Sequence, residues 1–353
     1  MSAPSSPRRD APPQDLGEDP LPAPGSGSPR RGGVRTWHLV AGTALLVLAA
    51  CGSLFIGVAG LTPWGLLRAD PADVLVFVES RVPRLLAVLL AGMAMSVAGL
   101  VMMHITRNRF VSPSTAGTTE SASLGVLVAV MFAGTEAILV KMTIAVVFAL
   151  LGTFFFLWIL RRLTFRDMIL VPLVGIMFGG VISAVTTFLA YRADLLQTLG
   201  VWTSGDFSSV LRGRYELLWL AGAVTLLGYL YADRFTVAGL GRGFAINLGV
   251  PYDRVINLGL FLTAVITAVV VVTVGEIPFL GLIVPNLVTL MLGDNLRRVL
   301  PVTALAGAFF VLACDVIGRV IRYPYEIPVG TVVGVVGGAV FLALVLHSRR
   351  RTV

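Results

Sequence analysis

The sequence predicts an all-α polytopic membrane protein with about ten transmembrane helices. Of its 353 residues, 56% are hydrophobic and only 13% are charged, and the mean hydropathy is +0.89. A soluble domain of this length cannot bury so much apolar side chain in its own core, so lipid must supply part of its solvent. Because lipid offers no hydrogen-bond partner to an open backbone, we expect the spans to be helices.

Successive apolar runs predict the individual spans. A hydrocarbon core of about 30 Å takes roughly 20 helical residues, and the runs fit that length or a tilted or broken version of it. They cover residues 38–61, 84–103, 114–134, 138–160, 168–190, 215–232, 255–274, 278–293, 301–320 and 327–346. The run 278–293 is short and contains Pro278 and Pro285, so its helical pattern is the weakest.

Basic residues flank these runs unevenly. All of the 27 basic residues except Lys141 are arginines, and with ten spans most of them fall on the side of the two termini. Examples are the segments 107–109, 161–166 and 349–351. The positive-inside rule therefore predicts a multi-pass protein of the cytoplasmic (inner or plasma) membrane with both termini in the cytoplasm. Charge placed in this way also argues against nucleic acid as a partner.

Composition divides the chain into three regions. Residues 1–35 are rich in Pro, Gly and Ser and cannot bury enough apolar surface to fold, so we expect a disordered cytoplasmic tail. Residues 36–348 form the transmembrane domain, and residues 349–353 form a short cytoplasmic C-terminal tail. A signal peptide matches poorly, because the tail is too polar and the first apolar run is too long.

Two connections are longer than simple turns. Residues 191–214 lie on the outer side and mix aromatic and polar residues, which suggests a short surface helix. Residues 232–254 lie on the cytoplasmic side, and their glycines predict two short helices with a break between them. Such a pair would offer a small apolar surface, from Ala245, Leu248 and Gly249, to a cytoplasmic partner. A solvated linker is the alternative, whereas a phosphate cradle is disfavoured because the segment follows a membrane span rather than a strand.

The chain lacks the residues of common catalytic and metal sites. Lys141 is the only lysine and no P-loop surrounds it, so any ATP-driven motor must be another chain. Cys51 and Cys314 lie within apolar runs and predict no disulfide framework. The three histidines form no ligand spacing. We therefore expect no catalytic residue, no metal site and no cofactor bound by this chain.

Ionisable residues at membrane depth are candidates for function. Glu120 lies in a polar part of the run 114–134 and is a candidate for the wall of a transport pathway. Asp315 and Arg319 are four residues apart and can pair along a helix, either for function or for structure.

Glycines at helical spacing form a second group of candidates. Gly175 with Gly179, and Gly330 with Gly334, recur every four residues and let helices approach closely. They indicate a subunit interface or a pathway wall, or else ordinary packing within the chain.

Two arginines stand at the mouth of the run 84–103. Arg81 and Arg84 flank Pro83, and the charge asymmetry places them on the outer face, where basic residues are under-represented. Snorkelling to lipid phosphate is one account of them. Pro83 suits the first turn of a helix, where no backbone donor is needed.

Four segments resemble the FecCD family of ABC importer permeases, which carry iron–siderophore, haem and vitamin B12 cargo. They are "RVPRLLAVLLAGMAMSVAGLVM" (81–102), "RNRFVSPSTAG" (107–117), "GRGFAINLGV" (241–250) and the long segment from "GEIPFLGLIVPN" to "EIPVG" (275–330). The resemblance implies the type II importer permease fold. The chain departs from the usual family pattern at Arg109-Phe110 and at Asn286. At these positions it resembles the branch of the family that takes up catecholate or mixed catecholate–carboxylate siderophores.

The resemblance also implies partners and site residues. It implies a second permease, identical or not, two ATPase subunits that hold ATP and Mg, and an extracytoplasmic binding (lipo)protein. The implied residues for docking the binding protein are Arg81, Arg84 and Arg319. For the ATPase coupling loop they are Gly243, Ala245, Leu248 and Gly249, and we add Arg242 from the same loop. For the translocation path or dimer contact they are Gly175, Gly179, Gly330 and Gly334, and we add Glu120 because of its depth in the membrane. The expected function is the transmembrane permease of an ATP-driven ferric siderophore importer.

Other functions remain open from the residues. Haem or cobalamin could be the cargo within the same family. An ion-driven secondary carrier would require paired carboxylates near the midplane, for which Glu120 is the only candidate in the sequence. A membrane receptor would bind its ligand without accumulating it.

Overall fold

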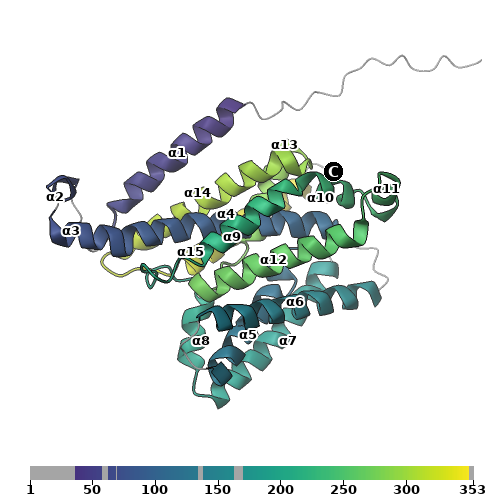
Figure 1. Cartoon of the computed structure of the whole chain (residues 1–353), viewed down its shortest axis with the longest axis horizontal. Helices are drawn as coiled ribbons and strands as arrows, with labels where there is room; N and C mark the ends of the chain where they lie inside the picture. The colour runs from purple at the N-terminus through teal and green to yellow at the C-terminus, as the bar shows by residue number, and fades with distance from the viewer. Residues whose placement is uncertain (1–35, 58–62, 69, 134–137, 163–169, 350–353) are drawn as a thin grey trace, which may run out of the picture. The chain divides into compact units, whose positions relative to one another are not determined.

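The computed structural model describes residues 36–57, 63–68, 70–133, 138–162 and 170–349, which contain helices and loops but no strand. The predicted N-terminal tail and residues 350–353 lie outside the described residues. Figure 1 shows that most of the long helices run in one general direction.

Each of the ten predicted runs coincides with an apolar helix. These are α1 (Thr36–Leu54), α4 (Val82–Thr106), α5 (Thr118–Ala133), α6 (Ile138–Arg162), α7 (Leu170–Arg192), α9 (Leu218–Leu230), α12 (Tyr252–Val274), α13 (Leu280–Leu292), α14 (Leu296–Val320) and α15 (Val329–Arg349). Within the described residues, five helical stretches are long and apolar enough to cross a membrane and five more are shorter apolar helices. The predicted all-α membrane fold is confirmed.

Helix α14 begins five residues before the run that predicted it. The Asn295 side chain caps this helix by accepting a hydrogen bond from the backbone of Arg298 at 3.4 Å. The first turn is polar, so hydropathy alone missed it.

The start of α4 differs more from the prediction. The helix is continuous from Pro71 through α3 (Pro71–Val76) and the π-helix η1 (Phe77–Arg81), so Pro83 lies inside it rather than in its first turn. Proline has no N–H to offer the carbonyl four residues earlier, which belongs to Glu79. That carbonyl instead accepts the backbone N–H of Arg212 at 3.1 Å. A contact from a distant loop thus compensates for the proline.

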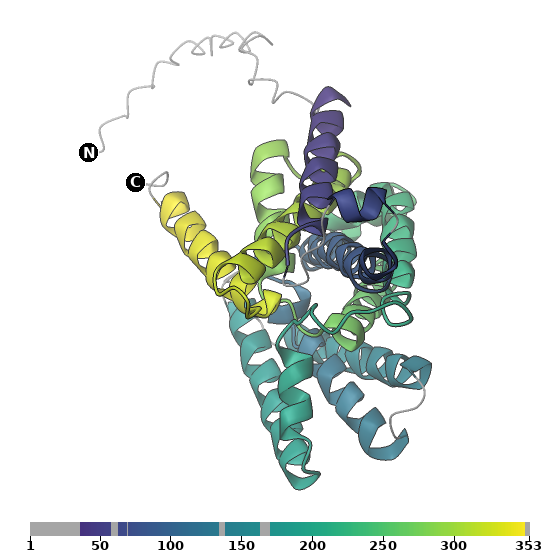
Figure 2. The same cartoon turned by 90° about the vertical axis from the view of Figure 1, so that its left-hand side faces the viewer.

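Helices α4 and α12 form the centre of the bundle. In the most apolar stretch of each helix, 78% is buried inside the protein for α4 and 72% for α12, against 28% for α6 and 22% for α7. Figure 2 shows the blue ribbon of α4 end-on with other helices around it. Gly99 of α4 lies so close to α13 that a Cβ on it would overlap the backbone of Gly281. The exposed apolar faces of α6 and α7 are left for lipid or a partner.

The short elements lie at the ends of the bundle. Helix α2 (Pro63–Leu67) and α3 are found at the left of Figure 1, and α10 (Ala232–Gly239) and α11 (Arg242–Asn247) at the right. We call the latter, residues 232–249, the coupling end. Helix α8 (Leu196–Thr203) confirms the short helix predicted in 191–214, and α10 and α11 confirm the broken pair. The break falls at Gly241, whose φ of 113° favours glycine.

Candidate functional site

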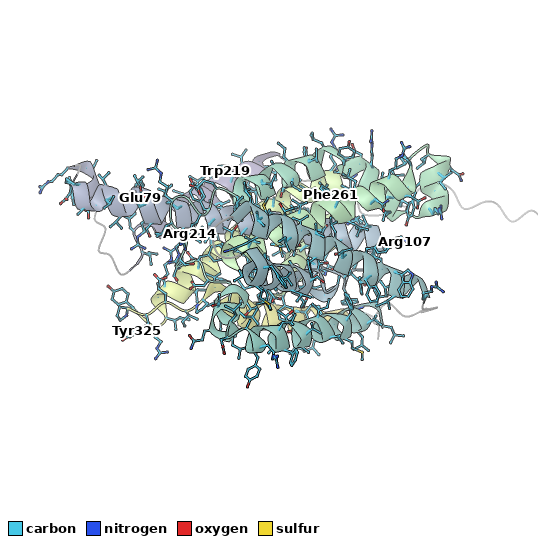
Figure 3. The ribbon with its side chains drawn as sticks, turned by 60° about the horizontal axis from the view of Figure 1, so that its bottom comes forward. Glu79, Arg107, Arg214, Trp219, Phe261 and Tyr325 are labelled. Carbon is cyan, nitrogen blue, oxygen red and sulfur yellow. The ribbon has the colours of Figure 1, made fainter. Side chains whose placement is uncertain are left out.

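The three arginines predicted to dock a binding protein lie together at the end of the bundle opposite the coupling end. Figure 3 shows Glu79, Arg214 and Tyr325 at this end and Arg107 toward the other. Arg81 and Arg84 are each 7% exposed and Arg319 is 4% exposed. Their guanidinium groups therefore face the protein interior rather than an open surface.

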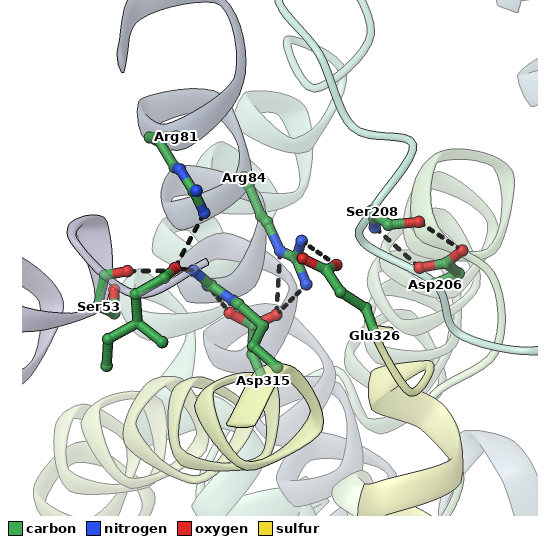
Figure 4. A network of polar contacts seen from close by, with 9 residues as sticks. Ser53, Arg81, Arg84, Asp206, Ser208, Asp315 and Glu326 are labelled. Carbon is green, nitrogen blue, oxygen red and sulfur yellow. Dashed lines mark hydrogen bonds and ion pairs between the residues drawn. The ribbon is translucent and has the colours of Figure 1, made fainter. Parts of the chain in front are cut away.

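Asp315 is the centre of this cluster (Figure 4). It is fully buried, and its Oδ1 accepts from Arg84 Nη2 at 2.8 Å and from Arg84 Nε at 3.1 Å. Its Oδ2 pairs with Arg319, which confirms the pair predicted from the four-residue spacing. Arg84 Nη1 also bonds Glu326 at 2.6 Å. We call Arg81, Arg84, Asp315, Arg319 and Glu326 the arginine network.

Backbone carbonyls complete the network. Arg319 Nη1 donates to the carbonyl oxygens of Ser53 at 3.1 Å and Ile56 at 2.9 Å. Arg81 Nη1 donates to the same Ile56 oxygen at 2.9 Å. The network thus ties the end of α1 to α4 and α14. Docking by these arginines stays a prediction, and it requires them to exchange internal partners for external ones.

The predicted coupling residues fall on α11 and the turn that follows it. Arg242 forms an exposed ion pair with Asp253 at 3.1 Å, and Gly243 lies exposed beside it. Gly249 has a φ of 73° and nothing within 4 Å of a Cβ built on it, as suits the glycine that ends a helix. Leu248 is exposed. These four residues are accessible to a partner.

Ala245 corrects the predicted surface. Its methyl group is fully buried, so it packs α11 against the bundle and cannot contact a partner. The exposed apolar side chains are Phe244, Ile246 and Leu248. The sequence analysis did not predict Phe244 and Ile246, because it assumed that small residues form the contact surface. In the helix these two side chains lie on other faces than Ala245 and are therefore exposed.

Two of the predicted path residues, Glu120 and Gly330, lie beside Glu276, which was not a candidate in the sequence, and Gly179 lies beside Glu120. A Cβ on Gly179 would lie 3.0 Å from the carboxyl carbon of Glu120, and one on Gly330 would lie 2.9 Å from the Glu276 carbonyl oxygen. The Gly330 N–H also donates to the Gly205 carbonyl at 3.0 Å. Glycine is needed at Gly330 because backbone atoms occupy the space of a side chain, whereas at Gly179 the close neighbour is the Glu120 side chain.

The other two glycines behave differently. A Cβ on Gly175 would overlap the carbonyl oxygen of Thr115, so α7 packs here against its own chain. Gly334 has only the Pro278 ring at 3.5 Å, an ordinary contact. Gly175 and Gly179 thus pack against residues of their own chain, and their role in a contact with a second permease stays a prediction.

Glu120 and Glu276 line one small cavity of about 40 Å³ with serine and threonine hydroxyls. Beside it, a larger hollow of about 650 Å³ shares Ser183 and Thr187 with the small cavity. Glu276 could have been found from a repeated triplet, because "EIP" occurs at 276–278 and again at 326–328, each time just before a helix. The second copy contains Glu326 of the arginine network.

The two departures from the family pattern contact each other. The side-chain amide of Asn286 donates to the carbonyl oxygens of Arg109 and Leu282, both at 2.7 Å. Arg109 in turn pairs with Asp294 at 3.2 Å. These residues lie near a hollow of about 420 Å³ that His104, Arg107, Arg109 and Asp294 help to line beside α10. The two positions that depart from the family pattern therefore lie at the same end of the bundle as α10.

Comparison with known proteins agrees with this architecture. The chain is 48% identical over 305 residues to the petrobactin import system permease protein YclN of Bacillus subtilis (strain 168), covering 86% of this chain and 96% of that protein. It is 44% identical over 299 residues to the ferric-anguibactin transport system permease protein FatD of Vibrio anguillarum, covering 84% and 95%.

A solved structure gives the same fold. An inward-facing metal-chelate type ABC transporter superposes with a TM-score of 0.76 at 26% identity, covering 89% of this chain and 100% of that one. The model of the FecCD transport family matches residues 45–347. The chain is a transport component, a multi-pass protein of the plasma membrane that works with ATPase and binding-protein components. It belongs to the FecCD transport family.

Proposed function

We propose that the chain is the permease subunit of an ATP-driven importer that moves a ferric siderophore across the cytoplasmic membrane. The observation that supports this most is the identity of 48% and 44%, along nearly the whole length, with permeases named for petrobactin and ferric-anguibactin import. The chain itself performs no covalent chemistry. Its contribution is a helical bundle that can adopt two packings of different stability.

The ATPase partners act at the coupling end in this proposal. Two ATPase subunits hold ATP and Mg, and the exposed apolar side chains of Phe244, Ile246 and Leu248 sit in a cleft of one of them. Closure of the ATPases on ATP pulls α10 and α11, which pack against α4, α12 and α14. The central helices therefore transmit the motion to the opposite end.

The remaining partners complete the assembly. A second permease, identical or a paralogue, covers the exposed apolar face of α7, and lipid covers the outer faces. Both termini lie in the cytoplasm, and an extracytoplasmic binding lipoprotein delivers the cargo at the end that carries the arginine network. Glu120, Glu276 and the hollow beside α7 then border the path between the two permeases.

Uptake by the reconstituted assembly tests the proposal. Vesicles that hold the permease, its ATPases and its binding protein should accumulate radioactive iron supplied as a ferric siderophore, and vanadate should abolish this uptake. Haem and cobalamin should fail to compete. Competition by either one would assign the cargo to that class instead.

One observation gives weight to an ion-driven carrier, because the structure supplies Glu120 with a second carboxylate, Glu276. Uptake that resists vanadate but collapses with a protonophore would support that mechanism and reject the proposed one. Binding without accumulation would instead indicate a receptor.

A further inference from the structure

The small cavity that contains Glu120 and Glu276 has room for an ion together with a few water molecules. Its volume is about 40 Å³, and it lies where α5, α7, α8 and the α12–α13 connection meet. Two carboxylates and the hydroxyl groups of two serines and three threonines line it. We call this space the acidic cavity. It is far too small for a chelated metal, so whatever occupies it is distinct from the cargo.

The lining of the acidic cavity consists mainly of hydrogen-bond acceptors. The hydroxyls of Thr186, Thr187 and Thr203 each donate their proton to the carbonyl oxygen four residues earlier, at 2.8, 2.8 and 3.0 Å. Once the proton is used in this way, a hydroxyl offers only lone pairs to the cavity. Ionised carboxylates also only accept. No Lys, Arg or His is among the lining residues. The cavity therefore calls for a positively charged or donating occupant.

Two unpartnered oxygens provide independent evidence of a missing ligand. Ser123 is 6% exposed and lines the cavity, and its Oγ has no hydrogen-bond partner among the described residues. Glu120 Oε2 is likewise buried without a partner. Buried polar atoms are normally satisfied, and a buried carboxylate oxygen is especially costly to leave bare. Both atoms belong to the same cavity, so one occupant can satisfy both.

We propose that the acidic cavity binds one small, hard metal cation of the size of Na⁺ or Ca²⁺, coordinated by Glu120, Glu276 and the hydroxyl oxygens around them. An all-oxygen donor set suits hard cations, and Ca²⁺ accepts irregular geometry from carboxylates and neutral oxygens. Transition metals prefer imidazole or thiolate, and neither His nor Cys is among the residues that line the cavity.

The site connects elements that lie far apart in the sequence. Glu120 lies on α5, and Glu276 lies in the connection whose carbonyl packs against Gly330 of α15. A cation between the two carboxylates replaces their mutual repulsion with a shared attraction. It would therefore favour the packing in which α5 and the start of α13 are close.

A thermal-stability titration of the purified assembly tests the site. The unfolding midpoint should rise saturably with NaCl or CaCl₂ but not with choline chloride at equal ionic strength, and the two salts distinguish the two ions. Glu120→Gln and Glu276→Gln should each lose the rise. Glu79→Gln should keep it, because this acid lies outside the cavity in an exposed pair with Arg212.

A milder variant covers the case in which the glutamine variants do not fold. Ser123→Ala keeps both carboxylates and should weaken cation binding by about tenfold or more, read as a shift of the titration midpoint. Radioactive ²²Na⁺ or ⁴⁵Ca²⁺ should bind at one ion per permease. If neither salt acts beyond the choline control, or if all variants respond like the wild type, the carboxylates are neutralised by protons and the site is rejected. An assembly that binds the cation but imports no siderophore would reject the proposed function and leave the site intact.

Discussion

Asp315 holds Arg84 and Arg319 at once, and the Ile56 carbonyl accepts from Arg81, which explains why Arg81 and Arg84 can stand at the mouth of an apolar helix. The buried carboxylate contacts Arg84 and Arg319, while Glu326 takes a further donor of Arg84. Buried charges are tolerated when they are paired and hydrogen-bonded. The network also differs from a free cationic patch, since most of its donors already have acceptors.

Asp315→Asn should strongly destabilise the permease. The substitution removes the negative charge between two buried guanidinium groups, and breaking a buried pair in this way costs about 3–5 kcal/mol. Thermal unfolding of the purified assembly measures the loss. As a control, Glu79→Gln removes an exposed pair with Arg212 and should cost only about 0–1 kcal/mol. Equal midpoints for wild type and Asp315→Asn would show that the network contributes nothing to stability.

At the scale of elements, α10 and α11 form a compact pair of short helices at one end of the bundle. Glycine at 249 ends α11, and three exposed apolar side chains surround the turn. A bulky residue at this turn would meet the ATPase before the rest of the surface does. The coupling loop can therefore be tested without touching the helical core.

Gly249→Trp should uncouple ATP hydrolysis from cargo while the permease still inserts. Loaded binding protein should no longer stimulate the ATPases, and uptake should fall by about tenfold or more, equivalent to ~1.4 kcal/mol. Gly213→Trp is a matched control, because Gly213 also has a positive φ (90°) and open space around it but lies far from the coupling end. Normal stimulation in Gly249→Trp, or equal loss in Gly213→Trp, would contradict the assignment.

The helices themselves could be predicted from hydropathy, because lipid imposes length and apolarity on each span independently. The partners within the site could not. Arg84 and Asp315 are 231 residues apart, and nothing local in the sequence links them. The sequence predicted Pro83 at a helix start, because the contact that lets the helix continue through it could not be seen. In that contact the backbone N–H of Arg212, from a distant loop, donates to the Glu79 carbonyl. The position of Glu276 beside Glu120 likewise depends on packing between α5 and the α12–α13 connection.

At the scale of the whole molecule, the two ends of the bundle carry different chemistry. One end offers the apolar turn of α11, and the other offers arginines and exposed tyrosines around Arg322. Arg322 is exposed and stacks over Tyr325 with 5.8 Å between its Cζ and the ring centroid. Arginine and tyrosine are enriched at protein–protein interfaces. Since the arginine network is buried, Arg322 is better placed than those arginines to contact a partner protein.

Arg322→Glu should weaken docking of the binding protein without changing stability, whereas Arg84→Glu should destabilise the permease itself. The attraction between exposed charges on two proteins is screened by salt. We therefore expect Arg322→Glu to lower the affinity for the binding protein about tenfold at low salt, and by less as salt is added. Reversal at Arg84 instead places a third carboxylate against Asp315 and Glu326 inside the bundle. Binding titrations at low and moderate salt, with the unfolding midpoint of each variant, separate the two effects. If Arg84→Glu loses docking at an unchanged midpoint while Arg322→Glu binds normally, the buried arginines must open toward the partner, and the docking surface is the network itself.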